Sequence, residues 1–358
     1  MTHVSDTCAE LIGTLAAGTP LTHEQYRFLF EHSTAEHYQL AAKEARRVCD
    51  RHYGRTVFLR GLIEFTNHCA CGCRYCGIRA KNTTVRRYRL TDTQILECCQ
   101  TGYKSGLRTF VLQGGEDAWY TDERLCSLVS KIRAEFPGCA ITLSAGERSR
   151  QSYQKLKDAG ADRYLLRHET ADQVHYAYLH PTPQSYRTRM RCLADLKALG
   201  YQTGAGMMVG SPGQTPDCLA ADMVFLGSFR PHMVGIGPFL PHHATPFAHE
   251  PKGSLDLTIF AAALVRLLLP CALIPATTAT ASASADGRIR ALGAGANVIM
   301  PNVTPAVGAQ YELYDGKLRS GLESAANIAE LTAALEQAGY TVPVSRGDFT
   351  DTQGGLYV

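Results

Sequence analysis

Short apolar runs alternate with longer amphipathic segments along most of this chain, and that alternation limits its fold more than any other feature. Eight runs have the length and residue types of buried strands, at 57–65, 109–112, 140–143, 163–166, 202–208, 233–236, 272–276 and 297–300. Segments with helical periodicity fill the gaps, at 92–105, 122–136, 150–159, 185–199, 216–226, 255–269 and 286–292. Strands that alternate with helices form parallel βαβ units.

A closed (β/α)8 barrel of the TIM type needs roughly 250 residues. Residues 57–305 supply that length. We therefore predict an α/β protein with an N-terminal helical extension at 1–56, a barrel at 57–305 and a C-terminal cap segment at 306–358. A doubly wound open sheet is the alternative fold.

Charge and hydropathy exclude two classes of partner. Lys and Arg number 36 and Asp and Glu number 33, a net charge of +3 that is too balanced for a dedicated nucleic-acid-binding protein. The longest apolar run, 259–276, contains Arg266 and is broken by Pro270 and Pro275, which disfavours a membrane span. The N-terminus lacks the basic start of a signal peptide. We expect a cytoplasmic protein that binds neither nucleic acid nor membrane.

Four of the thirteen cysteines lie within eight residues, directly after the first predicted strand. The carboxyl ends of barrel strands are where active sites form. Cys69, Cys73 and Cys76 have the spacing C-x3-C-x2-C. Three thiolates on a four-iron cluster leave one iron open to another ligand. Cys71 is interpreted as a bystander, because a candidate ligand lies two residues away on either side.

Other metal sites fit this segment less well. A structural zinc site usually needs a second ligand pair elsewhere, and no later CxxC or HxxxH motif completes one. The spacing also differs from that of a ferredoxin. A non-enzymatic metal carrier that uses all four cysteines remains as an alternative from another functional class.

Polar residues and glycines follow the second predicted strand in the sequence Gln113-Gly114-Gly115-Glu116-Asp117. Two glycines let the backbone approach a ligand closely, and the carboxylate of Glu116 can accept hydrogen bonds from an ammonium group. We interpret this turn as a binding segment rather than an ordinary loop.

Polar residues also end the third and fourth predicted strands. Thr142 and Ser144 share one face of the third strand. Arg167 and Glu169 share a face after the fourth and point into the predicted barrel mouth, where a buried charge needs a partner or a ligand. His168 is on the other face and is interpreted as a packing residue.

The cysteine motif, with Tyr75 before its last cysteine, resembles the radical S-adenosylmethionine superfamily. Within that superfamily the chain is most similar to the HydE family of FeFe-hydrogenase maturases, over roughly residues 55–320. The segments that carry this second resemblance are 113–117, 165–170, 235–239, 275–278 and 297–302. Biotin synthase and methylornithine synthase share the same architecture.

The resemblance implies a 4Fe-4S cluster bound by Cys69, Cys73 and Cys76, with S-adenosylmethionine on the open iron. It implies S-adenosylmethionine contacts from Tyr75, Gly114, Gly115, Glu116, Ser144, Glu169 and Arg189. It also implies a substrate cavity lined by Gln113, Arg167, Met233, Thr277 and Tyr314.

The implied activity is reductive cleavage of S-adenosylmethionine to a 5′-deoxyadenosyl radical that acts on an iron–cysteine precursor bearing CO and cyanide. The implied partners are this small substrate, a one-electron donor of flavodoxin or ferredoxin type, and the other hydrogenase maturases. A radical amino-acid mutase of the methylornithine synthase type is the alternative. Some family members hold a second cluster through C-terminal cysteines. This chain has no cysteine after Cys271, so we predict one cluster.

Overall fold

The computed structural model describes residues 2–318 and 327–350. The strands are β1 (Phe58–Leu59), β2 (Gly61–Thr66), β3 (Thr109–Gly114), β4 (Ala140–Ser144), β5 (Arg163–Leu165), β6 (Gln202–Val209), β7 (Met233–Pro238) and β8 (Val298–Ile299). The helices that precede and follow the first strands are α1 (Thr2–Ala16), α2 (His23–His32), α3 (Ala35–Tyr53), α4 (Asp92–Lys104), α5 (Asp122–Glu135) and α6 (Arg150–Asp158). The later helices are α7 (Gln173–Leu179), α8 (Tyr186–Ala198), α9 (Pro216–Phe229), α10 (Leu255–Leu268), α11 (Thr278–Ala283), α12 (Gly287–Gly293), the 3-10 helix η1 (Ala306–Gln310) and α13 (Ile328–Gln337).

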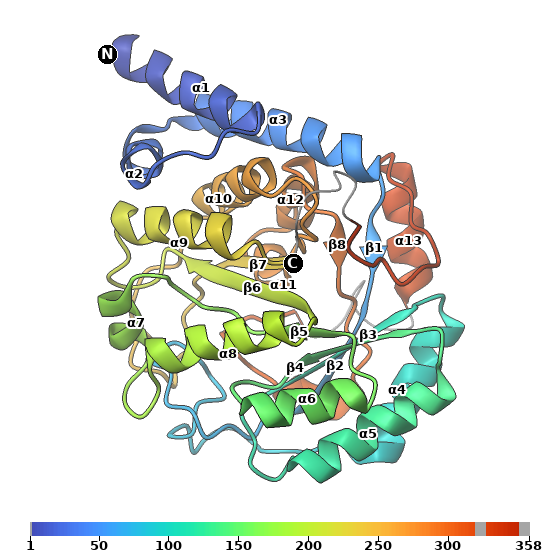
Figure 1. Cartoon of the computed structure of the whole chain (residues 1–358). Coiled ribbons are helices and arrows are strands. Elements are labelled where there is room, and N and C mark those ends of the chain that lie inside the picture. Colours follow the sequence, from blue (N-terminus) through green and yellow to red (C-terminus); the bar gives the residue numbers. More distant parts are fainter. Residues whose placement is uncertain (1, 319–326, 351–358) are drawn as a thin grey trace.

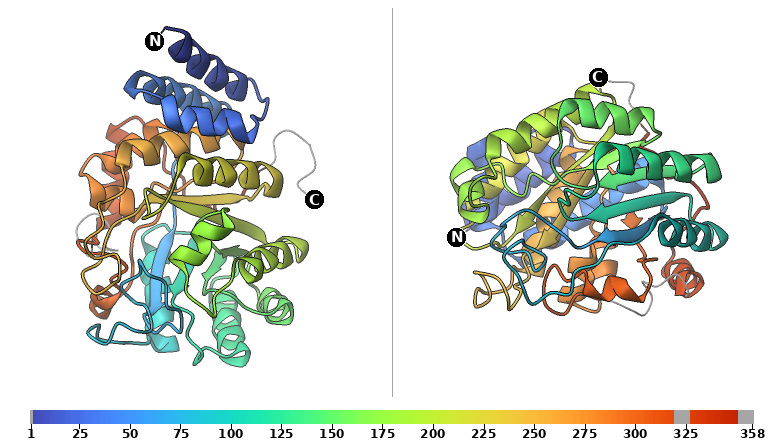
Figure 2. Two further views of the ribbon diagram at one scale, coloured as in Figure 1. Left: turned by 90° about the vertical axis from the view of Figure 1, so that its left-hand side faces the viewer. Right: turned by 90° about the horizontal axis from the view of Figure 1, so that it is seen from below.

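The sheet is parallel, with helices around its outside (Figures 1 and 2), so the α/β class is confirmed. Six strands pair in sequence order from β2 to β7, and β1 pairs with β8 as a separate two-stranded ladder. The register places Gln113 of β3 beside Ser144 of β4. Both residues were predicted to belong to the site.

The seventh predicted strand, 272–276, does not form a ladder. The segment makes two isolated bridges instead, from Leu273 to Met233 of β7 and from Pro275 to Val298 of β8. A proline has no backbone N–H, so Pro275 cannot donate the next ladder bond. The segment still bonds to both neighbours, because Val234 N donates to Leu273 O at 3.0 Å and Ala276 N donates to Val298 O at 2.8 Å. The Leu62–Asn302 bridge links β2 to the segment after β8.

The first predicted strand, 57–65, divides at Arg60 because the chain changes its pairing there. Phe58 and Leu59 pair with β8, whereas Gly61 and the residues after it pair with β3. Helices α7 and α11 were not predicted, because seven and six residues are too short to show a helical period. Both begin at a side-chain cap, Asp172 for α7 and Thr277 for α11.

Helices α1–α3 form a layer over one side of the molecule, where α3 packs along α10 and α2 against α9 (Figure 2). Within the described ranges, no helix has the length and apolar character to cross a bilayer. In the long apolar run, Arg266 is fully buried and donates to the carbonyls of Gly295 and Pro270. The three-part division at residues 56 and 305 stays a prediction.

The described C-terminal segment crosses the amino ends of the strands. The carbonyl of Arg346 accepts hydrogen bonds from Thr109 Oγ1 and Arg163 Nη2, at 2.7 and 2.9 Å. Asp348 pairs with Arg163 at 2.7 Å. This segment therefore closes the end of the barrel opposite the predicted site.

Candidate active site

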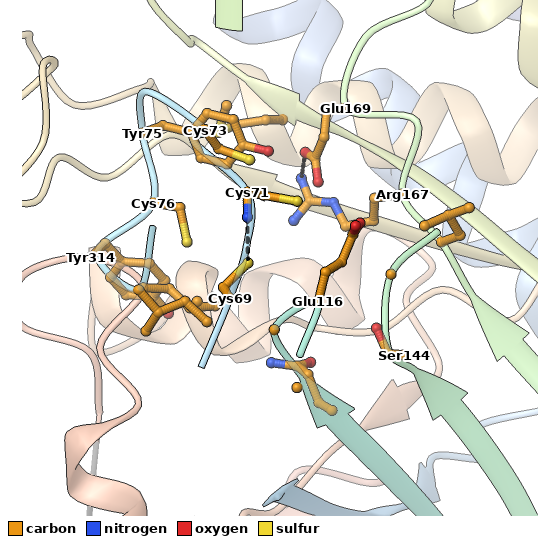
Figure 3. Close-up of a pocket in the computed structure, with 18 of the residues that line it drawn as sticks. Cys69, Cys71, Cys73, Tyr75, Cys76, Glu116, Ser144, Arg167, Glu169 and Tyr314 are labelled. Atoms are coloured by element: carbon orange, nitrogen blue, oxygen red, sulfur yellow. Dashed lines mark hydrogen bonds and ion pairs between the residues drawn. The ribbon is translucent and has the colours of Figure 1, made fainter. Parts of the chain in front are cut away.

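A cavity of about 270 Å3 lies at the carboxyl ends of the strands (Figure 3). Its walls come from the loop after β2, from the ends of β3 to β7, and from the segment after η1. Barrel enzymes place their active sites at this end of the sheet. The cavity is therefore the place to look for the predicted site residues.

The cysteine loop leaves β2 without helix or strand structure, and neighbouring segments satisfy its backbone. Ala70 N donates to Glu116 O at 2.8 Å, and Gly77 N donates to Leu313 O at 2.9 Å. Arg87 donates to four carbonyls, those of Asn67, Ile78, Arg79 and Asn82. These bonds hold the loop open around a space instead of letting it collapse.

The thiols of Cys69, Cys73 and Cys76 line the cavity, and Cys71 lies between the first two (Figure 3). The Cys71 thiol is hydrogen-bonded to the thiols of Cys69 and Cys73. These bonds lower the pKa of Cys69 and of Cys73 and raise the pKa of Cys71. Burial raises the pKa of Cys76. Thiolates bind iron, so three converging thiols beside open space suit an iron–sulfur cluster.

The glycines of the Gln113–Asp117 turn permit close contact with the cysteine loop. A Cβ at Gly115 would overlap the His68 carbonyl oxygen and lie 2.6 Å from Cys69 Cβ. Gly146 has φ +77°, and a Cβ added to it would overlap the Glu116 side chain. The Glu116 side chain therefore packs directly against the backbone at Gly146, and its Oε1 accepts a hydrogen bond from Glu147 N at 3.0 Å. Burial raises the pKa of Glu116.

Arg167 and Glu169 follow β5 and both line the cavity. Arg167 Nη2 donates to Met207 O at 2.7 Å and lies 3.0 Å from Glu169 Oε2. Arg167 Nε and Glu169 Oε2 are nevertheless buried without a hydrogen-bond partner of good geometry. Glu169 also has φ +66°, a strained conformation for a residue with a side chain. Unsatisfied polar atoms and backbone strain at one point are typical of a ligand site.

Two further contacts fix the wall around this pair. Arg189, on α8, pairs with Glu147 at 2.7 Å and donates to the carbonyl of Arg167. Tyr75 contacts His180 Nε2 through its hydroxyl at 2.9 Å, and burial raises the pKa of that tyrosine. The arginine and the tyrosine are therefore held in place before any ligand binds.

The cavity brings together most of the predicted residues: Cys69, Cys73, Tyr75, Cys76, Gln113, Gly114, Gly115, Glu116, Ser144, Arg167, Glu169, Arg189 and Tyr314. Met233 lies elsewhere, in a separate space inside the barrel where Arg60 Nη1 is 3.2 Å from its sulfur. Thr277 does not line the cavity either, because its hydroxyl caps α11 by accepting from Thr280 N. His168 is a packing residue, fully buried and 3.1 Å from Asp222.

Three polar residues that hold side chains of the site in place were not predicted. Glu147 holds Arg189, His180 holds Tyr75, and Gln184 contacts Cys73 Sγ at 3.4 Å. Each of them acts on another site residue from a loop that carries no motif. The only sequence signal was Gly146, directly before Glu147, which resembles an ordinary turn glycine.

Comparison with known proteins decides the family. Residues 63–226 match the model of the Radical SAM superfamily. The chain is 49% identical over 278 residues to the [FeFe] hydrogenase maturase subunit HydE of Thermotoga maritima, covering 77% of this chain and 78% of that one.

The chain belongs to the HydE family of radical SAM enzymes. Membership implies a 4Fe-4S cluster and S-adenosylmethionine as cofactors. The present chain is also 30% identical to the 3-methylornithine synthase of Methanosarcina acetivorans, over 79% of each chain. A crystal structure of methylornithine synthase (PylB) superposes with a TM-score of 0.82 at 28% identity, covering 93% of this chain and 97% of that one.

Proposed function

We propose that this chain is the radical enzyme that builds part of the FeFe-hydrogenase active-site cluster in the cytoplasm. One observation carries the proposal. Three thiols, a Gly-Gly-Glu turn and an arginine–glutamate pair converge on one cavity, in a chain 49% identical to a hydrogenase maturase.

The donor set of the cavity fits the cofactors of the family. Cys69, Cys73 and Cys76 would hold the 4Fe-4S cluster. When bound, the cluster and S-adenosylmethionine supply one-electron cleavage of a carbon–sulfur bond and a 5′-deoxyadenosyl radical. Glu116, fixed by the backbone of residue 147, would accept from the ammonium group of S-adenosylmethionine.

The unsatisfied atoms suggest where the other ligand groups lie. Glu169 Oε2 lies 3.0 Å from Arg167 Nη2 but accepts no hydrogen bond of good geometry, and Arg167 Nε is a buried donor without a hydrogen-bond partner. Arginine supplies fixed donors to anions, so Arg167 would bind an anionic iron–cysteine complex bearing CO and cyanide. Gln113 and Tyr314 would complete that wall. We leave Met233 and Thr277 out of the proposed substrate site.

The segment after η1 would exclude water from the reaction. Tyr311, Leu313 and Tyr314 line the cavity from this side. A buried ion pair between Lys317 and Glu64, at 2.5 Å, anchors the segment to β2. A radical intermediate must be kept from side reactions, which is the protein's part in such chemistry.

The proposal includes partners outside the chain. A one-electron donor of flavodoxin or ferredoxin type would reduce the cluster, and the other hydrogenase maturases would supply the precursor and receive the product. The single cysteine-rich loop supports one cluster for each chain.

Two measurements test the function. Anaerobically reconstituted protein should convert S-adenosylmethionine to 5′-deoxyadenosine and methionine when dithionite supplies electrons. The gene should restore hydrogenase activity to a host that lacks its own maturase of this type. Failure of the first would contradict a radical enzyme and favour a metal carrier, whereas failure of the second alone would contradict maturation.

The likeness to methylornithine synthase supports a second candidate. A TM-score of 0.82 over 93% of the chain means that the same cavity could serve a radical mutase of an amino acid. Incubation with lysine, S-adenosylmethionine and reductant separates the two candidates. Methylornithine formation would favour the mutase, and unchanged lysine together with restored hydrogenase activity would favour the maturase.

A further inference from the structure

The chain around the cluster cysteines carries positive charge only. From Phe65 to Thr91 there is no Asp or Glu, while the basic residues are Arg74, Arg79, Lys81, Arg86, Arg87 and Arg89. The whole chain has a net charge of only +3, so this stretch is a local excess. It coincides with the loop that holds Cys69, Cys73 and Cys76.

Three of these six cations serve the fold. Arg87 donates to four carbonyls of the loop, and Arg79 donates to the carbonyl of Gly72 at 3.1 Å. Arg89 makes a two-bond ion pair with the buried Asp117. The guanidinium groups of Arg79, Arg87 and Arg89 are therefore bonded to acceptors of the same chain.

The other three cations have no acidic partner among residues 2–318 and 327–350, and we call them the basic loop face. Lys81 and Arg86 are exposed. Arg74 is half-buried and lies over the ring of Tyr178, 5.3 Å from its centroid. Within the described chain, Lys81 and Arg86 have no contact that would neutralise their charge, and Arg74 has only the ring of Tyr178.

The basic loop face lies beside the cluster thiols. Arg74 is between Cys73 and Cys76 in the chain, and Ala80 N donates to Cys71 O at 2.7 Å. Ala70 is exposed and Gly72 and Arg74 are partly so, which means that residues next to the cluster cysteines in the chain reach the surface. In Figure 1 the loop is drawn in light blue at the lower left, far from α1 and α3.

We propose that the basic loop face is the docking surface for an acidic one-electron carrier protein. This rests on the proposed function, because only a cluster that must be reduced needs such a carrier. One electron would pass from the carrier to the cluster, and the carrier would be oxidised by one electron. Opposite charges on the two surfaces speed the encounter and orient it, and the effect falls with ionic strength.

A charge-reversal pair tests the proposal. The variant K81E/R86E changes two exposed residues that do not line the cavity. The matched control K43E/R51E changes the net charge equally on α3, where both residues are exposed and make no ion pair within the described chain. The probe is an acidic bacterial flavodoxin in its fully reduced form, and stopped-flow absorbance follows reduction of the cluster.

At low ionic strength we expect K81E/R86E to slow cluster reduction about tenfold and the control less than about twofold, with the difference lost near about 0.5 M salt. Binding of oxidised flavodoxin, followed by titration calorimetry, should weaken in the same variant only. Equal rates in the two variants would overturn the docking proposal, provided that dithionite still drives cleavage in both. Failure of dithionite-driven cleavage in the unaltered enzyme would instead overturn the proposed function.

Discussion

Strand β5 and the residues that follow it place an arginine at each end of the barrel, and the two arginines have opposite surroundings. Arg163, at the amino end, is fully buried and pairs with Asp348, with the Arg346 carbonyl and with Thr109. Arg167, at the carboxyl end, lines a cavity, and its Nε has no hydrogen-bond partner. Every nitrogen of the Arg163 guanidinium donates to its own chain, whereas Arg167 keeps one buried donor without a partner beside the cavity.

The same contrast applies to other strands. Thr109 and Gln202 begin β3 and β6 and contact the segment 346–348. Gln113 and Met208, near the far ends of the same strands, line the cavity. Substitutions at the closed end should therefore reduce stability, and substitutions at the open end should reduce cofactor binding or turnover.

The largest effect is expected at the cysteines of the open end. Cys73→Ser should abolish cluster assembly and S-adenosylmethionine cleavage, because serine is a poor ligand for iron in such clusters. Cys71→Ser is the matched control and should retain both. Iron content and 5′-deoxyadenosine formation measure the outcome. Loss of the cluster in Cys71→Ser would mean that the fourth thiol is a ligand.

A methyl group added to the backbone at the open end should reduce cluster assembly. Gly115→Ala would place a Cβ against His68 O and Cys69, so the cysteine loop must move. We expect less than about half the iron content of the unaltered protein, with an unchanged melting temperature. Gly138→Ala is the control, since its Cβ would meet nothing within 4 Å. Full iron content in Gly115→Ala would show that the loop position is not critical.

The two arginines give the most direct comparison between the ends. Arg163→Met should lower the free energy of unfolding by about 3 kcal/mol, because it leaves buried acceptors without a donor. Arg167→Met removes the partner of Glu169 and a donor to the Met207 carbonyl, but its side chain is partly exposed, so the stability loss should be smaller, about 1 kcal/mol. The same change should reduce maturation activity at least about tenfold. Urea denaturation and hydrogenase activation measure the two quantities. A stability loss as large in Arg167→Met as in Arg163→Met would contradict the contrast.

The residues of the open end could be grouped from the sequence because they follow strands in short motifs, and the structure brings most of them to one cavity. Cys69–Cys76, Gln113–Glu116 and Arg167–Glu169 each follow an apolar run, and parallel strands bring such positions together. The closed end was not predicted, since its partners are far apart in the chain. The Arg163–Asp348 pair spans 185 residues and has no local pattern.

The predictions that failed or found no support also have physical reasons. The 272–276 segment lies between its two neighbours as predicted, but Pro275 has no N–H to donate, and the segment forms isolated bridges instead of a continuous ladder. Met233 was placed in the substrate cavity by resemblance, but it lies at the start of β7 and so faces the barrel interior near Arg60. Thr277 has a hydroxyl that could contact a ligand, but in the structure this hydroxyl accepts from Thr280 N and caps α11.

The smallest expected effect is the pH dependence of the closed end. Burial raises the pKa of Asp348, but hydrogen bonds from Arg346 and Arg163 outweigh it and hold the pKa below the usual value. Because the pKa is lower in the folded state, the extra stability is present above the unfolded pKa, about 3.9, and is lost as the pH falls below it.

We therefore expect the unaltered protein to lose more stability than Asp348→Asn as the pH falls from about 4 to about 2, below the unfolded pKa of a carboxyl group. Urea midpoints at a series of pH values measure this difference. The same pH slope in both proteins would mean that Asp348 does not stabilise the closed end.

The central claim is that three thiolates at the open end leave one iron free to bind S-adenosylmethionine. Paramagnetic resonance of the reduced, reconstituted protein tests it most directly, with S-adenosylmethionine labelled with 15N at its amino group. The account predicts about four irons for each chain and a hyperfine coupling from the labelled nitrogen to the cluster. A spectrum unchanged by S-adenosylmethionine, or zinc bound to these cysteines, would contradict it.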